Sequence, residues 1–117
     1  MDSDTIKLIM NQLRQGSLIW EGRKIALELA RKKVHEGFTK AGKSIYKYFW
    51  QCNECKEWFR DVSSVEVDHI EEIGPYKGDW NDYINRMYCS VDNLQVLCVK
   101  CHLGKTTKNA RERWVRK

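Results

Sequence analysis

With 117 residues, the chain is long enough for one compact domain with a helical extension and too short for two full domains. Its 42% apolar and 32% charged residues are typical of a globular protein, and no segment approaches the roughly 18 apolar residues of a membrane span. Its 21 lysines and arginines against 16 aspartates and glutamates give a net charge of +5, which suits nucleic-acid binding but also serves solubility alone. The first residues lack the basic and apolar parts of a secretory signal, so we expect a cytoplasmic protein with no membrane partner.

The N-terminal third of the chain predicts two helices. Residues 3–14 carry apolar side chains at helical spacing, with Ser3 or Asp4 as the N-cap and Gly16 as the stop. The same spacing recurs over residues 20–34 and predicts a second, more basic helix.

Lys32 and Lys33 lie on the polar side of the second predicted helix. A solvated helix face explains such residues, and contact with the phosphates of nucleic acid is the alternative. The polar, glycine-containing segment 37–43 indicates a turn after this helix. We therefore expect a helical extension over residues 1–40 and a separate unit over residues 41–117.

The second unit combines short strands with helices. Aromatic and β-branched residues, or alternation of apolar and polar residues, predict strands at 45–51, 65–70 and 94–97. Residues 74–92 resemble an insertion in which Asp79 caps a short helix. From Val99 onward the chain has no proline and is expected to be helical.

Four of the five cysteines form two C-x2-C pairs, Cys52 with Cys55 and Cys98 with Cys101. Disulfides do not persist in a reducing cytoplasm, whereas four thiolates in two such turns form the closed tetrahedral site of a structural zinc. A redox dithiol, an incidental pairing and an iron–sulfur site are the alternatives. Cys89 has no partner at short spacing and is expected to be a small buried hydrophobic residue.

Because a zinc ion closed by four sulfurs has no open position, catalysis requires other residues. Asp68 and His69 place a carboxylate beside an imidazole, and His102 directly follows the last zinc cysteine. His35, the third histidine, lies far from them in the sequence and is expected to be exposed.

Several motifs of this chain occur in the order seen in the HNH endonuclease family. They are Cys52 and Cys55, Val-Asp-His-Ile at 67–70, Asn-Leu-Gln-Val-Leu-Cys at 93–98, and Cys101-His102 followed by Lys105-Thr106. The chain thus resembles this family in its form with two C-x2-C pairs, and it is similar to small bacteriophage HNH proteins. The resemblance implies an α+β fold, a ββα-metal core stapled by a four-cysteine zinc and preceded here by the helical extension.

The resemblance also implies roles for single residues. His69 is the general base that removes a proton from the attacking water, while Asp68 and His102 hold a catalytic Mg²⁺ or Mn²⁺ ion. Asn93 ties the loop between the two strands and so orients His69. Basic residues of the C-terminal helix are further candidates for phosphate contact: Lys105, Arg111 and Arg113.

The sequence therefore predicts a metal-dependent endonuclease that hydrolyses DNA phosphodiester bonds by nicking or double-strand cleavage. Its similarity to phage proteins suggests assistance in genome packaging, with a terminase or another phage protein as partner in the host cytoplasm. The alternative is a non-catalytic zinc module that binds DNA or a protein. That alternative explains the four cysteines but leaves Asp68, His69, Asn93 and His102 without a role.

Overall fold

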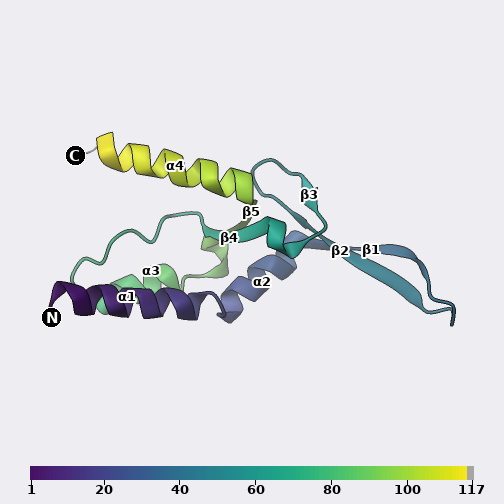
Figure 1. Cartoon of the computed structure of the whole chain (residues 1–117), viewed down its shortest axis with the longest axis horizontal. Helices are drawn as coiled ribbons and strands as arrows, with labels where there is room; N and C mark the ends of the chain where they lie inside the picture. The colour runs from purple at the N-terminus through teal and green to yellow at the C-terminus, as the bar shows by residue number, and fades with distance from the viewer. Residues whose placement is uncertain (116–117) are drawn as a thin grey trace.

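The computed structural model describes the backbone of residues 1–115 and the side chains of residues 1–112, which form an α+β fold (Figure 1). The helices are α1 (Ser3–Ser17), α2 (Glu21–Ala30), α3 (Trp80–Met87) and α4 (Val99–Val115). The strands are β1 (Arg31–Phe38), β2 (Ser44–Gln51), β3 (Trp58–Phe59), β4 (Val65–His69) and β5 (Leu94–Cys98). Two 3-10 turns, η1 (Val62–Ser64) and η2 (Val91–Asn93), precede β4 and β5. None of the described helices is long and apolar enough to cross a membrane.

The centre of the fold is a ββα unit made of β4, β5 and α4. The two strands pair antiparallel, from Val65 opposite Cys98 to His69 opposite Leu94, and α4 begins directly after β5. Alternate residues of β4, Val65 and Val67, are buried against α2, and the residues between them face the side of α4. The predicted strands at 65–70 and 94–97 and the C-terminal helix are therefore confirmed.

The prediction of a second helix over residues 20–34 is wrong in its C-terminal part. Helix α2 ends at Ala30, and β1 pairs antiparallel with β2, from Arg31 opposite Trp50 to Phe38 opposite Ser44. Lys32 and Lys33 consequently lie on a strand. Helical spacing of apolar residues is a local signal, whereas β1 is stabilised by a partner strand that the local pattern does not reveal.

The turn between β1 and β2 lies where the sequence indicated one. The Thr39 backbone NH donates to the Lys43 carbonyl at 2.8 Å, and Gly42 supplies the positive φ of 83°. The predicted division of the chain at residue 40 falls within this turn, between two paired strands, and it stays a prediction.

Helix α1 is capped earlier and ends later than its sequence signals suggest. The N-cap is Asp2, whose carboxylate accepts from the Thr5 NH at 2.7 Å, instead of Ser3 or Asp4. Gly16 lies inside the helix and does not end it. A Cβ atom at Gly16 would lie 2.7 Å from the Tyr88 hydroxyl, so this glycine allows close approach of the segment after α3.

The insertion at residues 74–92 contains the predicted helix α3. The Asp79 carboxylate accepts from the Asn81 NH at 2.9 Å, as expected for an N-cap. The loop before α3 is held by Arg86, whose guanidinium donates to the carbonyls of Ile73 and Pro75, the latter at 2.9 Å. This contact fixes the loop beside the end of β4.

Candidate active site and metal centre

The two cysteine pairs come together where the ends of three elements meet. Cys52 and Cys55 lie in the turn after β2, Cys98 ends β5, and Cys101 lies in the first turn of α4. Their four sulfur atoms all lie within 4.8 Å of one another. Sulfurs around a tetrahedral zinc with Zn–S bonds of about 2.3 Å are separated by about 3.8 Å, so this cluster fits a zinc ion with small adjustments.

Backbone groups hold the cysteine turns in place. The Asn53 NH donates to the Val96 carbonyl at 2.8 Å, which ties the first turn to β5. The Lys56 NH donates to the Cys52 carbonyl at 3.0 Å, with Lys56 at a φ of 64°. At the second pair, the Cys101 NH donates to the Cys98 sulfur at 3.4 Å. The first of these contacts joins two segments that are distant in sequence, and the other two shape the turn within each cysteine pair.

The electrostatics of the thiol cluster favour a cation. Burial opposes ionisation of Cys52, but backbone hydrogen bonds, with Cys98 foremost, outweigh it and lower the Cys52 pKa to about 6. The pKa of Cys101 is raised to about 12 by its hydrogen bond with Cys98, by burial and by the neighbouring thiols. Hydrogen bonds from the Glu57 backbone and the Cys101 thiol lower the pKa of Cys55, yet burial and the Cys52 and Cys98 thiols raise it overall. One thiolate forms easily, and further negative charge requires a compensating ion.

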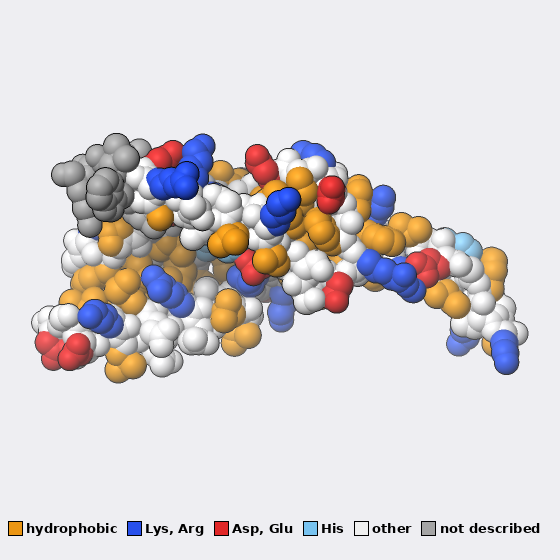
Figure 2. Space-filling model, turned by 45° about the horizontal axis from the view of Figure 1, so that its top comes forward, with side chains coloured by type: hydrophobic (Ala, Val, Ile, Leu, Met, Phe, Trp, Pro, Cys, Tyr) orange, Lys and Arg blue, Asp and Glu red, His pale blue; other side chains and the backbone are white. Residues whose placement is uncertain are grey.

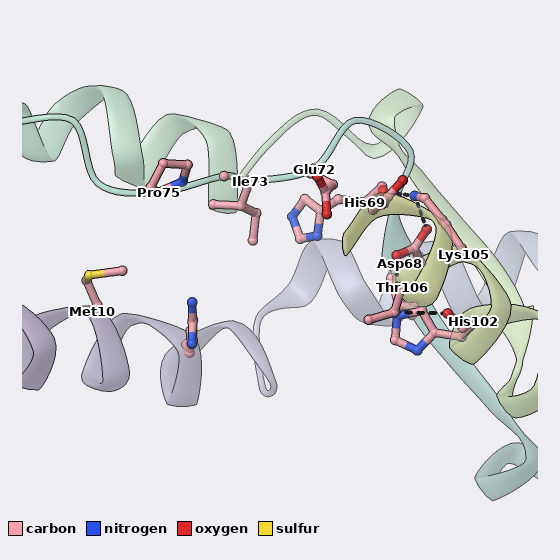
Figure 3. Close-up of a pocket in the computed structure, with 13 residues that line it drawn as sticks. Met10, Asp68, His69, Glu72, Ile73, Pro75, His102, Lys105 and Thr106 are labelled. Carbon is pink, nitrogen blue, oxygen red and sulfur yellow. Dashed lines mark hydrogen bonds and ion pairs between the residues drawn. The ribbon is translucent and has the colours of Figure 1, made fainter. Parts of the chain in front are cut away.

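A second group of polar residues lies at the end of β4. Asp68 comes from this strand and His102 from the first turns of α4, with the His102 Nε2 atom 3.4 Å from the Asp68 Oδ1 atom. Both residues line a cavity of about 600 Å³ that His69 also lines (Figure 3). Alternation along β4 would separate Asp68 from His69, but the strand ends at His69, and both residues reach the same cavity.

The imidazole of His69 is oriented by α3. Its Nε2 atom lies 2.6 Å from the carbonyl oxygen of Met87, the last residue of that helix. A carbonyl oxygen only accepts hydrogen bonds, so Nε2 carries the proton and Nδ1 of the neutral ring holds a lone pair. The insertion at residues 74–92 thus fixes the tautomer of His69.

A sequence model of the HNH endonuclease family matches residues 52–108. The chain belongs to the HNH endonuclease family. The matched segment contains both cysteine pairs, β4, α3, β5 and the first part of α4. No curated protein and no solved structure matches the chain. Membership of the HNH family implies a nucleic-acid substrate, and the predicted similarity to phage proteins stays a prediction.

Asn93 of the HNH segment lies next to the chain that follows His69. Its side-chain oxygen accepts from the Glu71 NH at 3.0 Å, and its side-chain nitrogen lies 3.5 Å from the Glu71 carbonyl. Its own carbonyl accepts from the Ile70 NH at 2.8 Å. Asn93 thus ties the segment after β4 to the turn before β5, and its predicted role in orienting His69 stays a prediction.

Glu66 is a residue of the HNH site that the sequence analysis did not name. Its carboxylate pairs with Nδ1 of His102, while the Asp68 carboxylate accepts from the Gln95 side chain at 3.0 Å. Glu66 precedes Asp68 by two residues on β4, so strand alternation places both carboxylates on one face. This alternation is the sequence signal from which Glu66 could have been predicted.

Lys105 contacts the protein itself and does not project into solvent. Its ammonium group pairs with the Asp68 carboxylate and donates to the carbonyls of His69 and Ile70, the latter at 3.1 Å. The ammonium and the Asp68 carboxylate lie side by side in Figure 3. Lys105 therefore offsets negative charge at the end of β4.

Three other predicted nucleic-acid contacts, Lys32, Lys33 and Arg111, do not line this cavity. Lys32 and Lys33 lie on β1, and Arg111 is exposed on α4. The side chain of Arg113 lies outside the described residues. Helix α1 instead contributes Arg14 to the cavity lining, a contribution that no local sequence signal indicates.

Proposed function

We propose that this HNH chain is a metal-dependent endonuclease that hydrolyses phosphodiester bonds in DNA. The supporting observation is the convergence of Asp68, His69 and His102 on one cavity beside a cluster of four cysteines. A carboxylate and an imidazole suit a divalent ion, and a second, neutral imidazole suits a general base.

Asp68 and His102 are the proposed ligands of a Mg²⁺ or Mn²⁺ ion. Two ligand atoms at about 2.1 Å from an ion, at right angles, lie about 3 Å apart, close to the 3.4 Å between Asp68 Oδ1 and His102 Nε2. When bound, such an ion stabilises the negative charge that develops on the phosphate and on the leaving oxygen. Glu66 holds the Nδ1 side of His102, which leaves Nε2 for the ion.

His69 is the proposed general base. With Nε2–H donated to Met87, the Nδ1 lone pair is available to take a proton from water in the cavity. The Met87 carbonyl also stabilises the imidazolium that results, because the hydrogen bond that it accepts from Nε2–H becomes stronger when the ring is charged. Asn93 supports this arrangement by holding the backbone at Glu71.

Basic residues provide the proposed contacts with the phosphate backbone. Arg14 lines the cavity and suits the phosphates next to the cleaved bond, and Lys105 would contact them by exchanging one of its carbonyl partners for a phosphate oxygen. More distant phosphates are assigned to the residues named from the sequence: Lys32, Lys33, Arg111 and Arg113.

The four cysteines are proposed to hold a structural zinc. All four positions of a tetrahedral ion would be filled by sulfur, so this ion takes no part in the chemistry. It would join the end of β2 to the start of α4 and so keep His102 near Asp68.

A plasmid-nicking assay with Mg²⁺ or Mn²⁺ tests the proposed activity. We expect wild-type protein to convert supercoiled plasmid to open-circular or linear DNA. We expect His69→Ala to slow this by about 10²- to 10⁴-fold, the usual contribution of a general base. Zinc content and circular dichroism serve as controls for folding. A His69→Ala protein as active as wild type would overturn the assignment, and DNA binding without cleavage by wild type would favour the non-catalytic zinc module.

Packaging of a phage genome beside a terminase remains a more specific proposal within this function. It requires the chain to bind a terminase, and co-purification of the two proteins is the direct measurement. Cleavage without such binding would leave the nuclease function intact and remove the packaging role.

A further inference from the structure

The hairpin formed by β1, its turn and β2 carries the net charge of the molecule. This segment, residues 31–51, is called here the β-arm. It contains six lysines and arginines and one glutamate, a net charge of +5 that equals the net charge of the whole chain. The rest of the chain is balanced, with 15 of the 21 basic and 15 of the 16 acidic side chains. Figure 2 shows basic side chains along the arm, which extends away from the body.

One face of the β-arm alternates cations with aromatic rings. Strand pairing places three residues of β1 opposite three of β2 on this face: Arg31, Lys33 and His35 opposite Trp50, Tyr48 and Tyr46. The Arg31 guanidinium lies 4.2 Å from the centre of the Tyr48 ring, and the Lys33 ammonium lies 4.2 Å from that of Tyr46. These cation–π contacts hold the charges in fixed positions on an exposed strand, which lowers the entropy cost of binding an anion.

The β-arm is poorly explained by the needs of the fold. None of residues 31–51 is buried, and Trp50, at the base, packs against the core. Near the tip, Phe38 is 66% exposed and Tyr46 is 47% exposed. A protein partner would fit this surface badly, because lysine is depleted in protein interfaces. Density of positive charge combined with exposed aromatic rings fits a nucleic acid.

We propose that the β-arm binds a groove of duplex DNA, at a distance from the bond that the active site cleaves. The proposal rests on the proposed nuclease function for its substrate. A two-stranded ribbon fits the major groove of B-form DNA, which is about 12 Å wide, whereas the major groove of A-form RNA is too narrow. One face of Tyr46 and of Tyr48 is covered by a cation, which disfavours stacking of single-stranded bases on those faces.

The position of the β-arm predicts a dependence on duplex length. The arm projects away from α1, α3 and α4, while the cavity is lined by α1, α4 and the loop after β4 (Figure 1). The molecule is 62 Å long, which equals about 18 base pairs at about 3.4 Å per pair. A duplex much shorter than this length cannot occupy both the active site and the arm.

Matched pairs of lysine substitutions test the proposal. The arm variant carries Lys40→Gln and Lys43→Gln at the exposed tip, and the control carries Lys24→Gln and Lys100→Gln, two exposed lysines on α2 and α4. Binding is measured by fluorescence anisotropy without Mg²⁺ or Mn²⁺, over a series of salt concentrations. The probes are a 24-base-pair DNA duplex, an 8-base-pair duplex, a 24-nucleotide single strand and a 24-base-pair RNA duplex.

We expect the arm variant to bind the long DNA duplex more than about tenfold more weakly at 0.1 M salt. The slope of log affinity against log salt should fall by about 1.8, since each lost phosphate contact contributes about 0.9. The control pair should change neither quantity, and the short duplex should bind both variants alike.

Several results would overturn the proposal. They are equal losses in the arm and control variants, an equal loss with the short duplex, and an equal loss with the single strand or the RNA duplex. Nicking assays on the same variants separate the two proposals. If the wild-type protein nicks plasmid and the arm variant binds the long duplex as tightly as wild type, the arm proposal alone is wrong. If the arm variant binds the long duplex more weakly but the wild-type protein never nicks, the nuclease proposal alone is wrong.

Discussion

At the scale of single residues, Glu66 decides which nitrogen of His102 faces Asp68. Its carboxylate accepts from Nδ1, so in the neutral ring the Nε2 atom holds the lone pair. We predict that Glu66→Ala raises the Mn²⁺ concentration for half-maximal nicking by about 10- to 100-fold, as removal of a partner behind a metal ligand usually does. The maximal rate at saturating Mn²⁺ should change little, and Glu66→Gln should recover part of the loss. An unchanged Mn²⁺ requirement would show that Glu66 does not orient His102.

The thiol pKa values predict how zinc binding depends on pH. Near pH 7.5, Cys52 is a thiolate because its pKa is lowered to about 6, whereas Cys55 and Cys101 keep their protons because their pKa values are raised. Zinc must displace at least those two protons, so its affinity should fall by at least about 100-fold per pH unit between pH 8 and pH 7. Below about pH 6 the protonation of Cys52 adds a third proton and a steeper loss.

Competition with a chromophoric chelator at several pH values measures this dependence. Calorimetry in buffers of different ionisation enthalpy counts the released protons independently. Release of fewer than two protons per zinc at pH 7.5 would contradict the prediction.

At the scale of elements, the sequence predicted correctly those helices and strands whose signals lie within the element itself. Strand β4 was found from alternation and α3 from its Asp79 cap, because both signals lie within the element. The first part of β1 was mistaken for helix because no glycine or proline marks the junction of α2 and β1. The strand that pairs with β1 follows later in the chain, so the local pattern does not reveal it.

The same distinction holds for the candidate site. Asp68, His69 and His102 lie in short motifs whose order along the chain pointed to one family, and that family is confirmed. Arg14 was missed because its approach to the cavity depends on how α1 packs near Tyr88, which is 75 residues from Leu13 in sequence.

Docking of α1 on Tyr88 predicts a conditional effect of a helix substitution. The Tyr88 hydroxyl donates to the Leu13 carbonyl at 2.7 Å and would lie 2.7 Å from a Cβ atom at position 16. In an isolated helix Gly16→Ala stabilises by up to about 1 kcal/mol. In this chain we predict a loss of about 1 kcal/mol, because the methyl group displaces the hydroxyl and breaks its hydrogen bond.

Urea unfolding of a double-mutant cycle checks this prediction. Tyr88→Phe removes the hydroxyl, and the next ring atom lies 4.0 Å from the Cβ position, so Gly16→Ala should stabilise the Tyr88→Phe protein. The same effect of Gly16→Ala in both backgrounds would show that Tyr88 does not hold α1.

At the scale of the whole molecule, Cys52 and Cys98 of the cysteine cluster are part of the apolar interior. Among the residues whose side chains are described, one buried cluster consists of Cys52, Leu97 and Cys98, with Phe59 and Cys101 packed against it. The other lies between α2 and the β4–β5 sheet. Loss of zinc therefore leaves a small core with the buried Cys52 thiolate uncompensated by a cation.

We predict that Cys98→Ser releases zinc and unfolds the ββα unit. Structural zinc contributes about 10–16 kcal/mol in small domains, which is as large as the total stability of about 5–15 kcal/mol that a domain possesses. Cys89→Ser is the matched control, because Cys89 packs against the other cluster. This variant should keep one zinc per chain. Atomic absorption and circular dichroism measure the two outcomes. Omission of Mg²⁺ should stop nicking by the wild-type protein without a change in its circular dichroism spectrum. A folded Cys98→Ser protein with full zinc content would contradict the separation of a structural ion from a catalytic one.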